Sequence, residues 1–288
     1  MTRSKSAKIW KCRGRAIELG HTLIMGVLNV TPDSFSDGGS FVDPSVAVER
    51  ALEMVAEGAG IIDVGGESSR PGSKPVSAEE QIRRTAPVIA ELARQSDCLI
   101  SIDTMSSAVA RAALEAGAHI INDISGFERD PNMAALAAEY QAGAVLMHMQ
   151  GLPENMQDNP QYESVGAEVC GYLRQRAQVA IDAGLDAACV AVDPGIGFGK
   201  TQEHNVELLQ SISEMRELGC PVLIGASRKS LVGYLTGRPV DDRLAGSLGV
   251  AAYAIGQGAE ILRVHDVKET CDLARVLDKL TQDECPSK

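Results

Sequence analysis

A short pattern that recurs along the chain constrains its fold more than any other feature. It consists of a glycine, four to six mostly apolar residues, and then a polar residue or a glycine. Clear copies occupy residues 58–63, 117–122, 143–148 and 258–263, and looser copies occupy 184–193 and 219–225. A glycine suits the left-handed position that follows a helix. The apolar run after it is typical of a strand that is buried on both faces of a parallel sheet.

The residues before these glycines have helical periodicity. Val48, Leu52, Val55 and Ala59 fall at positions i, i+4, i+7 and i+11, which form one apolar stripe of a helix packed on a sheet. Similar helices are expected at 78–95, 105–115, 162–182, 206–218 and 245–257. Candidate strands lie near 23–29, 60–65, 98–103, 119–123, 143–148, 188–193, 221–226 and 259–264.

Eight strands that alternate with helices, without a low-complexity break, predict an α/β protein that folds as a single-domain (β/α)₈ TIM barrel. We expect the barrel to span 21–282, with a partly flexible N-terminal extension at 1–20 and a C-terminal tail at 283–288. An open, doubly wound sheet is the alternative. Such a sheet would more naturally carry G-x-G-x-x-G after its first strand, where this chain has NVTPDS.

The composition narrows the class of partner. The formal net charge of −12 leaves no broad basic surface for nucleic acid or an anionic membrane, although a local cationic pocket could hold an anion. No segment reaches the length of about 18 apolar residues that a membrane-spanning helix needs. The seven cysteines are scattered without a C-x-x-C pair, which is typical of reduced thiols in a cytoplasmic protein. The basic segment 1–15 is expected to be a frayed tail rather than a transit peptide.

Polar residues follow each of the eight predicted strands. In a barrel of this type the active site lies at the carboxyl ends of the strands and in the loops after them. One such residue could be a helix cap or a satisfied core group, but polar residues at every strand end favour a site. They are Asn29, Asp63 with Glu67, Asp103, Asn122 with Asp123, His148, Asp193, Arg228 with Lys229, and Arg263 with His265.

Acceptors and cations fall in different regions of the predicted mouth. Asp103, Asn122 and Asp193 end strands three, four and six, and they would need partners because an unpaired buried carboxylate is costly. A flat heterocycle with adjacent N–H donors would supply those partners. Lys229 and Arg263 follow strands seven and eight, where barrels commonly hold phosphate, and such cations suit phosphate oxygens.

Asn29 lies across the predicted barrel seam from strand eight, so its carbonyl oxygen could ligate a hard cation. Mg²⁺ that is shared with substrate phosphates needs only one or two protein oxygens. The use of Lys229 as a Schiff-base lysine is a weaker alternative, because Arg228 beside it favours an electrostatic role.

Three long loops are predicted, at 30–43, 66–76 and 149–160. Long loops without secondary structure in a compact domain are usually functional or disordered, and we expect the first two to close over the site as lids. The segment 195–199, GIGFG, lacks the third glycine of a nucleotide-binding loop. It is expected to be a flexible rim that presents Phe198.

Eight motifs occur in order between about residues 22 and 280: GVLNVTPDSFSDGG, IIDVGGESSRPG, SIDT, HIINDISGF, LMHMQG, DPGIGFGK, SRKS and RVHDVKET. This ordered set resembles that of the dihydropteroate synthases, the folate-pathway target of sulfonamides. Members of that family are transferases with a (β/α)₈ barrel and are usually homodimers. They join 6-hydroxymethyl-7,8-dihydropterin diphosphate to 4-aminobenzoate, and release pyrophosphate and 7,8-dihydropteroate.

The resemblance implies a role for each matching residue, with Arg263, His265, Lys229 and Asp103 as the catalytic set. It implies that the pterin binds at Asp103, Asn122, Asp193 and Lys229, the diphosphate at Ser69, Arg263 and His265, and Mg²⁺ at Asn29. It implies that Arg70, Pro71, Phe198 and Ser230 shape the aminobenzoate pocket. Ser69 stands where many members have threonine, and it keeps the hydroxyl donor.

Two other functions remain open at this point. A pterin-binding barrel that passes a methyl group from methyltetrahydrofolate to a corrinoid protein would share the Asp/Asn grip, but it has no need of the SRKS and RVH cations. An inactive pterin-binding paralogue that serves as a scaffold should have lost Asn29, Arg70, Lys229 or His265, and all four are present. The synthase reading is therefore favoured.

Overall fold

The computed structural model describes residues 8–31, 44–68, 73 and 75–281. Eight parallel strands form its sheet, in the order β8-β7-β6-β5-β4-β3-β10-β9. They are β3 (Leu23–Asn29), β4 (Ile61–Gly65), β5 (Leu99–Asp103), β6 (Ile120–Asp123), β7 (Gly143–Met147), β8 (Val190–Asp193), β9 (Leu223–Ile224) and β10 (Ile261–Val264). A parallel bridge between Val192 and Val222 joins the two ends of this order. The predicted (β/α)₈ barrel is confirmed, and the open doubly wound alternative is wrong.

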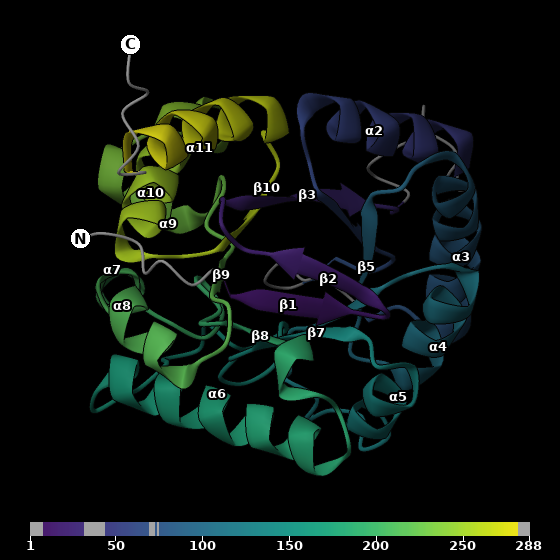
Figure 1. Cartoon of the computed structure of the whole chain (residues 1–288). Helices are drawn as coiled ribbons and strands as arrows, with labels where there is room; N and C mark the ends of the chain where they lie inside the picture. The colour runs from purple at the N-terminus through teal and green to yellow at the C-terminus, as the bar shows by residue number, and fades with distance from the viewer. Residues whose placement is uncertain (1–7, 32–43, 69–72, 74, 282–288) are drawn as a thin grey trace.

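Helices surround the sheet on its outer side (Figure 1). They are α2 (Pro44–Glu57), α3 (Ala78–Gln95), α4 (Ser107–Ala116), α5 (Met133–Tyr140), α6 (Val165–Asp182), α7 (Gln202–Gln210), α8 (Ile212–Met215), α9 (Ser230–Thr236), α10 (Leu244–Gln257) and α11 (Val267–Thr281), with short 3₁₀ turns η1 (Ala187–Cys189), η2 (Arg216–Leu218) and η3 (Val240–Asp242). The single helix expected at 206–218 is instead three pieces, because the chain leaves helical geometry at Ser211. No described helix is long and apolar enough to cross a membrane.

Alternation along the strands decides what fills the barrel. Successive side chains of a strand point to opposite faces of the sheet. One inward residue from each strand contributes to an apolar layer low in the barrel: Met25, Ile61, Leu99, Ile120, Val145, Ala191, Leu223 and Ile261. The outward residues, such as Ile62 and Ile100, belong to the larger core that the helices cover, with Leu92 and Leu114.

The same alternation places polar side chains inside the barrel one step higher. Asp63, Asn122, Asp193 and Arg263 each lie two residues after a member of the apolar layer, so they point inward as well. Asn29 and Asp103 lie four residues after Met25 and Leu99 and continue the same inward columns toward the mouth.

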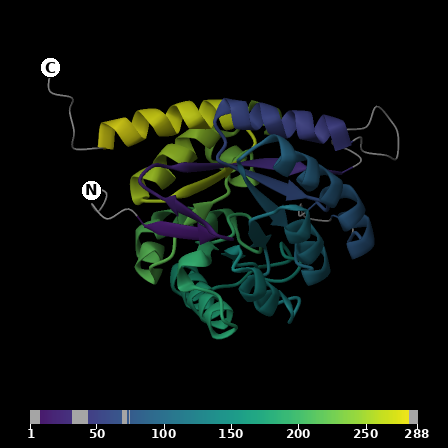
Figure 2. The same ribbon diagram turned by 45° about the vertical axis from the view of Figure 1, so that its right-hand side comes forward.

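An N-terminal hairpin closes the barrel at the end opposite to the mouth (Figures 1 and 2). It consists of β1 (Ile9–Cys12) and β2 (Arg15–Glu18), which pair antiparallel. Trp10 and Cys12 are fully buried and belong to the apolar layer of the barrel, and the Trp10 indole Nε1 donates to the carbonyl of Cys189 at 2.8 Å. The expectation of a frayed tail is therefore wrong for residues 9–18.

Basic side chains anchor this hairpin to backbone carbonyls around the barrel floor. Lys8 Nζ donates to the carbonyl of Cys220 at 2.9 Å, and Arg13 Nη1 donates to that of Ala118 at 2.9 Å. Arg15 Nη1 donates to the carbonyl of Asp97 at 2.5 Å. These carbonyls lie just before strands, where helices have ended and their backbone acceptors need partners. The basic composition of the segment thus serves packing.

The hairpin predicts a large effect of one substitution on stability. Trp10→Ala should lower the free energy of unfolding by about 3–5 kcal/mol, because it leaves a cavity in the floor and removes the indole hydrogen bond. Urea denaturation followed by circular dichroism measures this. Ile9→Ala, at the neighbouring and half-exposed position of the same strand, should change the free energy of unfolding by less than about 0.5 kcal/mol. Equal effects of the two substitutions would contradict the buried-plug assignment.

Candidate active site

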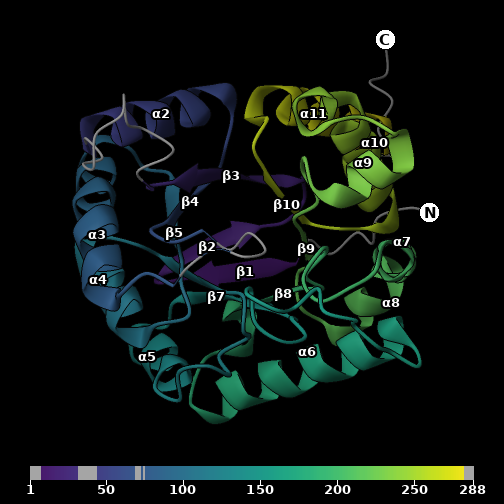
Figure 3. The ribbon, with the colours of Figure 1, turned by 180° about the vertical axis from the view of Figure 1, so that it is seen from behind.

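The centre of the mouth is an ion pair between three strands. Arg263, on β10, donates from Nε to Asp63 Oδ2 at 2.6 Å and from Nη2 to Asp103 Oδ2 at 2.7 Å. Asn122 Nδ2, on β6, donates to the same Asp63 oxygen at 3.0 Å. The Asp63 side chain is completely buried and that of Arg263 is 18% exposed. Side chains from β4, β5, β6 and β10 thus share one network. Figure 3 views the barrel from the end opposite to the hairpin, where these strands end.

The carboxyl groups of this network are held in a costly environment. Burial raises the pKa of Asp103 to about 7, the charge of Arg263 opposes this, and the charge of Asp63 adds to it. Burial also raises the pKa of Asp193, against the effect of Lys229. Among the described residues, Asp63 Oδ1 is buried without a hydrogen-bond partner. A ligand that brings N–H donors to this mouth would relieve these costs.

A second group of residues forms the corner of the mouth between β8 and α9. Lys229 Nζ donates to the carbonyl of Ile196 at 2.6 Å and lies 4.5 Å from the centre of the Phe198 ring. Burial lowers the pKa of Lys229 to about 8, although the nearby Asp193 carboxylate opposes this. Asp193 Oδ1 accepts from the Gly195 backbone N–H at 2.7 Å. The structure thus brings Asp193, Phe198 and Lys229 together.

The segment 195–199, which we call the rim loop, is bonded along its length, so the expectation of a flexible rim is wrong. Its three glycines have positive φ angles, a backbone conformation that other residues rarely adopt. A Cβ on Gly195 would lie 2.0 Å from the His148 carbonyl oxygen, and one on Gly199 would lie 2.3 Å from that of Gln150. The glycines therefore allow the rim loop to pack closely against residues 148–150.

The cations after strands seven and eight have different orientations. His265 Nδ1 lies 3.2 Å from Ser227 Oγ, and burial together with the charges of Arg263 and Arg228 lowers its pKa to about 4. Its imidazole is thus neutral at pH 7. Arg228 instead forms an ion pair with Asp266, just before α11, so its side chain is engaged there. Ser230 begins α9, and its Oγ accepts from Gln202 Nε2 at 3.3 Å.

Asn29 ends β3 and is paired in register with Gly65. A Cβ on Gly65 would lie 3.6 Å from Asn29 Oδ1, so the glycine leaves room beside the amide oxygen. No group of three or more His, Cys, Asp or Glu residues arranged to hold a metal occurs within the described part of the chain. One amide oxygen beside a glycine fits a hard cation that takes its other ligands from water and phosphate.

Several expected site residues lie outside the described residues. These are Ser69, Arg70 and Pro71 of the second long loop, and residues 32–43 of the first. The base of the second loop is described: Glu67 accepts from the Val76 backbone N–H and from Gln81 Nε2, both at 2.9 Å. A cavity of about 170 Å³ lies beside it, lined in part by Asp103, Met105 and Ile124.

Two residues that make contacts in the mouth, Asp63 and Lys200, were given no binding or catalytic role from the sequence. Asp63 is a strand-end residue by sequence, yet it is the acceptor that orients both Arg263 and Asn122. Its position two residues after the apolar-layer Ile61 is the signal that identifies it as inward. Lys200 ends the DPGIGFGK motif and is 2% exposed, and nothing in the local sequence indicates such burial. Asp123, beside Asn122, is not part of this network, because its Oδ1 accepts from the backbone N–H and the hydroxyl of Ser125.

Comparisons with known proteins agree with this geometry. Residues 25–265 match the family model of the pterin binding enzymes. The dihydropteroate synthase of Streptococcus pyogenes serotype M18 is 47% identical over 269 residues, which cover 93% of this chain and 98% of that protein. The Xanthomonas albilineans dihydropteroate synthase with 4-aminobenzoic acid superposes with a TM-score of 0.90 at 42% identity, over 96% of this chain and 100% of that one. The same enzyme in complex with 7,8-dihydropteroate gives 0.86 at 40% identity, with the same coverage.

The ion-pair network predicts a shift in one titration. Asp63→Asn removes a negative neighbour of Asp103, so the pKa of Asp103 should fall below its wild-type value. Carboxyl ¹³C NMR of the protein, with Asp103 assigned through Asp103→Asn, measures this. Asp186→Asn, which removes the exposed partner of Lys11 at the barrel floor, should leave the Asp103 titration unchanged. An unchanged or higher Asp103 pKa in Asp63→Asn would show that the two carboxyls are not coupled.

Proposed function

The chain belongs to the dihydropteroate synthases of the pterin binding enzyme family, and from that premise we propose how its residues divide the reaction. The enzyme is a transferase of folate biosynthesis that condenses 6-hydroxymethyl-7,8-dihydropterin diphosphate with 4-aminobenzoate. The observation that carries the assignment of residues is the meeting of Asp103, Asn122, Asp193 and Arg263 in one mouth. The corrinoid-linked methyltransferase is set aside because the likeness to the synthases covers nearly the whole chain. The inactive paralogue is set aside because Asn29, Arg70, Lys229 and His265 are all retained.

The pterin end of the site is the buried set of acceptors. Asp103, Asn122 and Asp193 point into the barrel from β5, β6 and β8, and their carboxylate and amide groups complement the N–H edge of a dihydropterin ring. Binding would replace water with N–H donors, which lowers the raised pKa values of the two carboxyl groups. Lys229 lies beside Asp193 and completes this subsite.

The diphosphate end lies at β10 and the seam. Arg263 and His265 would bind the leaving oxygens, with Ser69 from the second loop. A phosphate dianion beside His265 would raise its depressed pKa, so the imidazole would bind as a hydrogen-bond donor. We propose that Asn29 supplies the one protein oxygen of a bound Mg²⁺, which would neutralise charge on the leaving diphosphate.

The aminobenzoate end is formed by Phe198, Lys229 and Ser230, together with Arg70 and Pro71. The Phe198 ring offers an apolar face, and Lys229 offers a cation for the carboxylate of the substrate. The aromatic amine is already neutral at pH 7, so the site needs no strong general base. The arrangement therefore only has to hold the nitrogen near the pterin methylene.

We propose a dissociative substitution. The C–O bond breaks first, and the diphosphate leaves with the electron pair while the electron-rich pterin stabilises the cationic methylene. The amine nitrogen then forms the C–N bond and loses a proton to solvent. Rapid quench of enzyme and pterin diphosphate without aminobenzoate should show Mg²⁺-dependent cleavage of the C–O bond. Cleavage that requires aminobenzoate would favour concerted displacement.

Steady-state turnover tests the whole assignment. Pyrophosphate release should require both 4-aminobenzoate and the dihydropterin diphosphate, and 7,8-dihydropteroate should form in equal amount. Pyrophosphate release that continues over many turnovers without formation of the condensed product, or pterin binding without turnover, would overturn it.

The proposed metal role predicts a specific loss in Asn29→Ala. Removal of the amide oxygen should raise the Mg²⁺ concentration for half-maximal rate by roughly tenfold, which corresponds to an interaction of about 1.4 kcal/mol. Calorimetric binding of a pterin without phosphate, in metal-free buffer, should not change. Asn132→Ala, at an exposed position before α5, provides the matched control. A Mg²⁺ dependence equal to wild type would remove Asn29 from the metal site.

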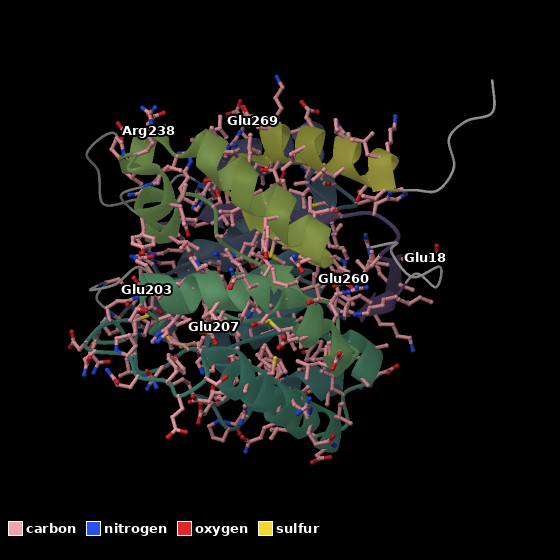
Figure 4. The ribbon with its side chains drawn as sticks, turned by 90° about the vertical axis from the view of Figure 1, so that its left-hand side faces the viewer. Glu18, Glu203, Glu207, Arg238, Glu260 and Glu269 are labelled. Atoms are coloured by element: carbon pink, nitrogen blue, oxygen red, sulfur yellow. The ribbon has the colours of Figure 1, made fainter. Side chains whose placement is uncertain are left out.

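We propose that the chain forms a homodimer through the face of α9, η3 and α10. Large apolar side chains are exposed on these neighbouring elements: Tyr234, Leu235, Val240, Leu244 and Tyr253. Figure 4 views this side of the molecule, with Arg238 and Glu269 at its upper edge. Exposed large apolar side chains on neighbouring elements favour a protein interface, and a second copy is the partner that the family expectation favours.

The six described cysteines are free, which supports a cytoplasmic location.

The dimer face can be tested by a charge. Leu235→Glu should halve the mass measured by light scattering at micromolar protein, because a carboxylate buried in an apolar interface is costly. Leu280→Glu, at the exposed end of α11, should leave the mass as in wild type. A dimer that survives Leu235→Glu would place the interface elsewhere.

A further inference from the structure

The rim loop belongs to no helix or strand, yet every one of its carbonyl groups accepts a hydrogen bond. Four of the donors are side chains of residues outside the loop, from three different parts of the barrel mouth. Within the loop, the Phe198 backbone N–H donates to the Gly195 carbonyl at 3.0 Å. Lys229 Nζ donates to the Ile196 carbonyl and Gln157 Nε2 to the Gly197 carbonyl, both at 2.6 Å. Lys200 Nζ donates to the Phe198 carbonyl and Tyr162 Oη to the Gly199 carbonyl, both at 2.8 Å. The position of the rim loop is thus set by side chains.

Among these donors, Lys200 is buried and makes several contacts. Its ammonium group lies 3.0 Å from His148 Nδ1, 2.8 Å from the Phe198 carbonyl and 3.3 Å from the His148 carbonyl. All three of these acceptors are uncharged, and burial lowers the pKa of Lys200 to about 7, although the charge of Asp193 opposes this. Burial and the Lys200 charge lower the pKa of His148 to about 3, so its imidazole is neutral and Nδ1 can accept.

The two elements that Lys200 joins are both part of the mouth. His148 directly follows β7, and its backbone N–H donates to the Asp193 carbonyl at 3.0 Å. Phe198 packs with Ile124, Met147 and Met156 in a small apolar cluster. Lys200 therefore ties the rim loop to the ends of β7 and β8.

A displacement of the rim loop would reach the aminobenzoate end of the site in two ways. It would move the Phe198 ring, and it would move the Ile196 carbonyl that holds Lys229. Lys200 is only 2% exposed, so it does not offer its own charge to a ligand in the open mouth.

We propose that Lys200 is a positioning residue for 4-aminobenzoate, which it serves by fixing Phe198 and Lys229 through the rim loop. This rests on the proposed function of Phe198 and Lys229 as the aminobenzoate subsite. It differs from a purely structural role, which would affect both substrates equally, or neither, once the protein has folded. Of the pterin acceptors, Asp103 and Asn122 are held by Arg263 and Asp63, and Asp193 alone accepts from the rim loop, through the Gly195 N–H.

Lys200→Met tests the proposal, because methionine is a flexible apolar side chain of similar length without N–H donors. The KM for 4-aminobenzoate should rise on the order of tenfold, since small misplacements at a reacting centre have large kinetic effects. The KM for the pterin diphosphate should rise by a clearly smaller factor, because Asp103 and Asn122 are held by Arg263 and Asp63 and not by the rim loop. Lys279→Met, at an exposed lysine near the end of α11, is the matched control and should behave as wild type. Equal changes in both KM values, or no change in a folded Lys200→Met protein, would overturn the proposal.

Tyr162→Phe provides a second measurement if Lys200→Met does not fold. It removes only the donor to the Gly199 carbonyl and keeps the ring, so the KM for 4-aminobenzoate should rise in the same direction by a smaller factor. An unchanged KM in that variant would count against control of the subsite by the rim loop. Turnover of wild type with both substrates in the same assay separates these outcomes from failure of the proposed function itself.

Discussion

The contact of Arg263 with Asp63 and Asp103 is the interaction on which the mouth depends. Two carboxyl groups and a guanidinium group lie inside a barrel whose next layer is wholly apolar. Neither carboxylate could be buried so deeply without the cation, because an uncompensated buried charge costs several kcal/mol. The strands are thus joined by side chains above the floor as well as by backbone ladders. A substrate that binds here would replace some of the hydrogen bonds that Asp63, Asp103, Asn122 and Arg263 make to one another.

Most of the fold could be predicted because it repeats. The glycine and apolar run occur in four clear and two looser copies, and eight predicted strands that alternate with helices leave few alternatives to a closed barrel. The N-terminal hairpin could not be predicted in the same way. Residues 8–18 are basic and have no strong period, and the carbonyls that they cap belong to residues about 80 to 210 positions away. Local sequence does not contain such distant partners.

The candidate site was predictable in composition but not in orientation. Strand ends identified Asp103, Asn122, Asp193 and Arg263, and the structure brings these together. Adjacent residues of a strand point to opposite faces of the sheet, so Asn122 faces into the barrel while Asp123 accepts from the backbone N–H of Ser125. Arg228 turns to Asp266 for a reason that lies in another element. Lys200 is buried because the rim loop folds over it, which requires tertiary packing to see.

The floor of the barrel also contains the only tryptophan of the chain. Trp10 is buried there against strands from both halves of the sequence, with a hydrogen bond 179 residues away. Its environment is complete only after the strands that form the floor have assembled. Intrinsic tryptophan emission is therefore an optical marker of ring closure during folding. Because the indole lies at the far end from the mouth, its signal separates global assembly from events at the substrate-binding end.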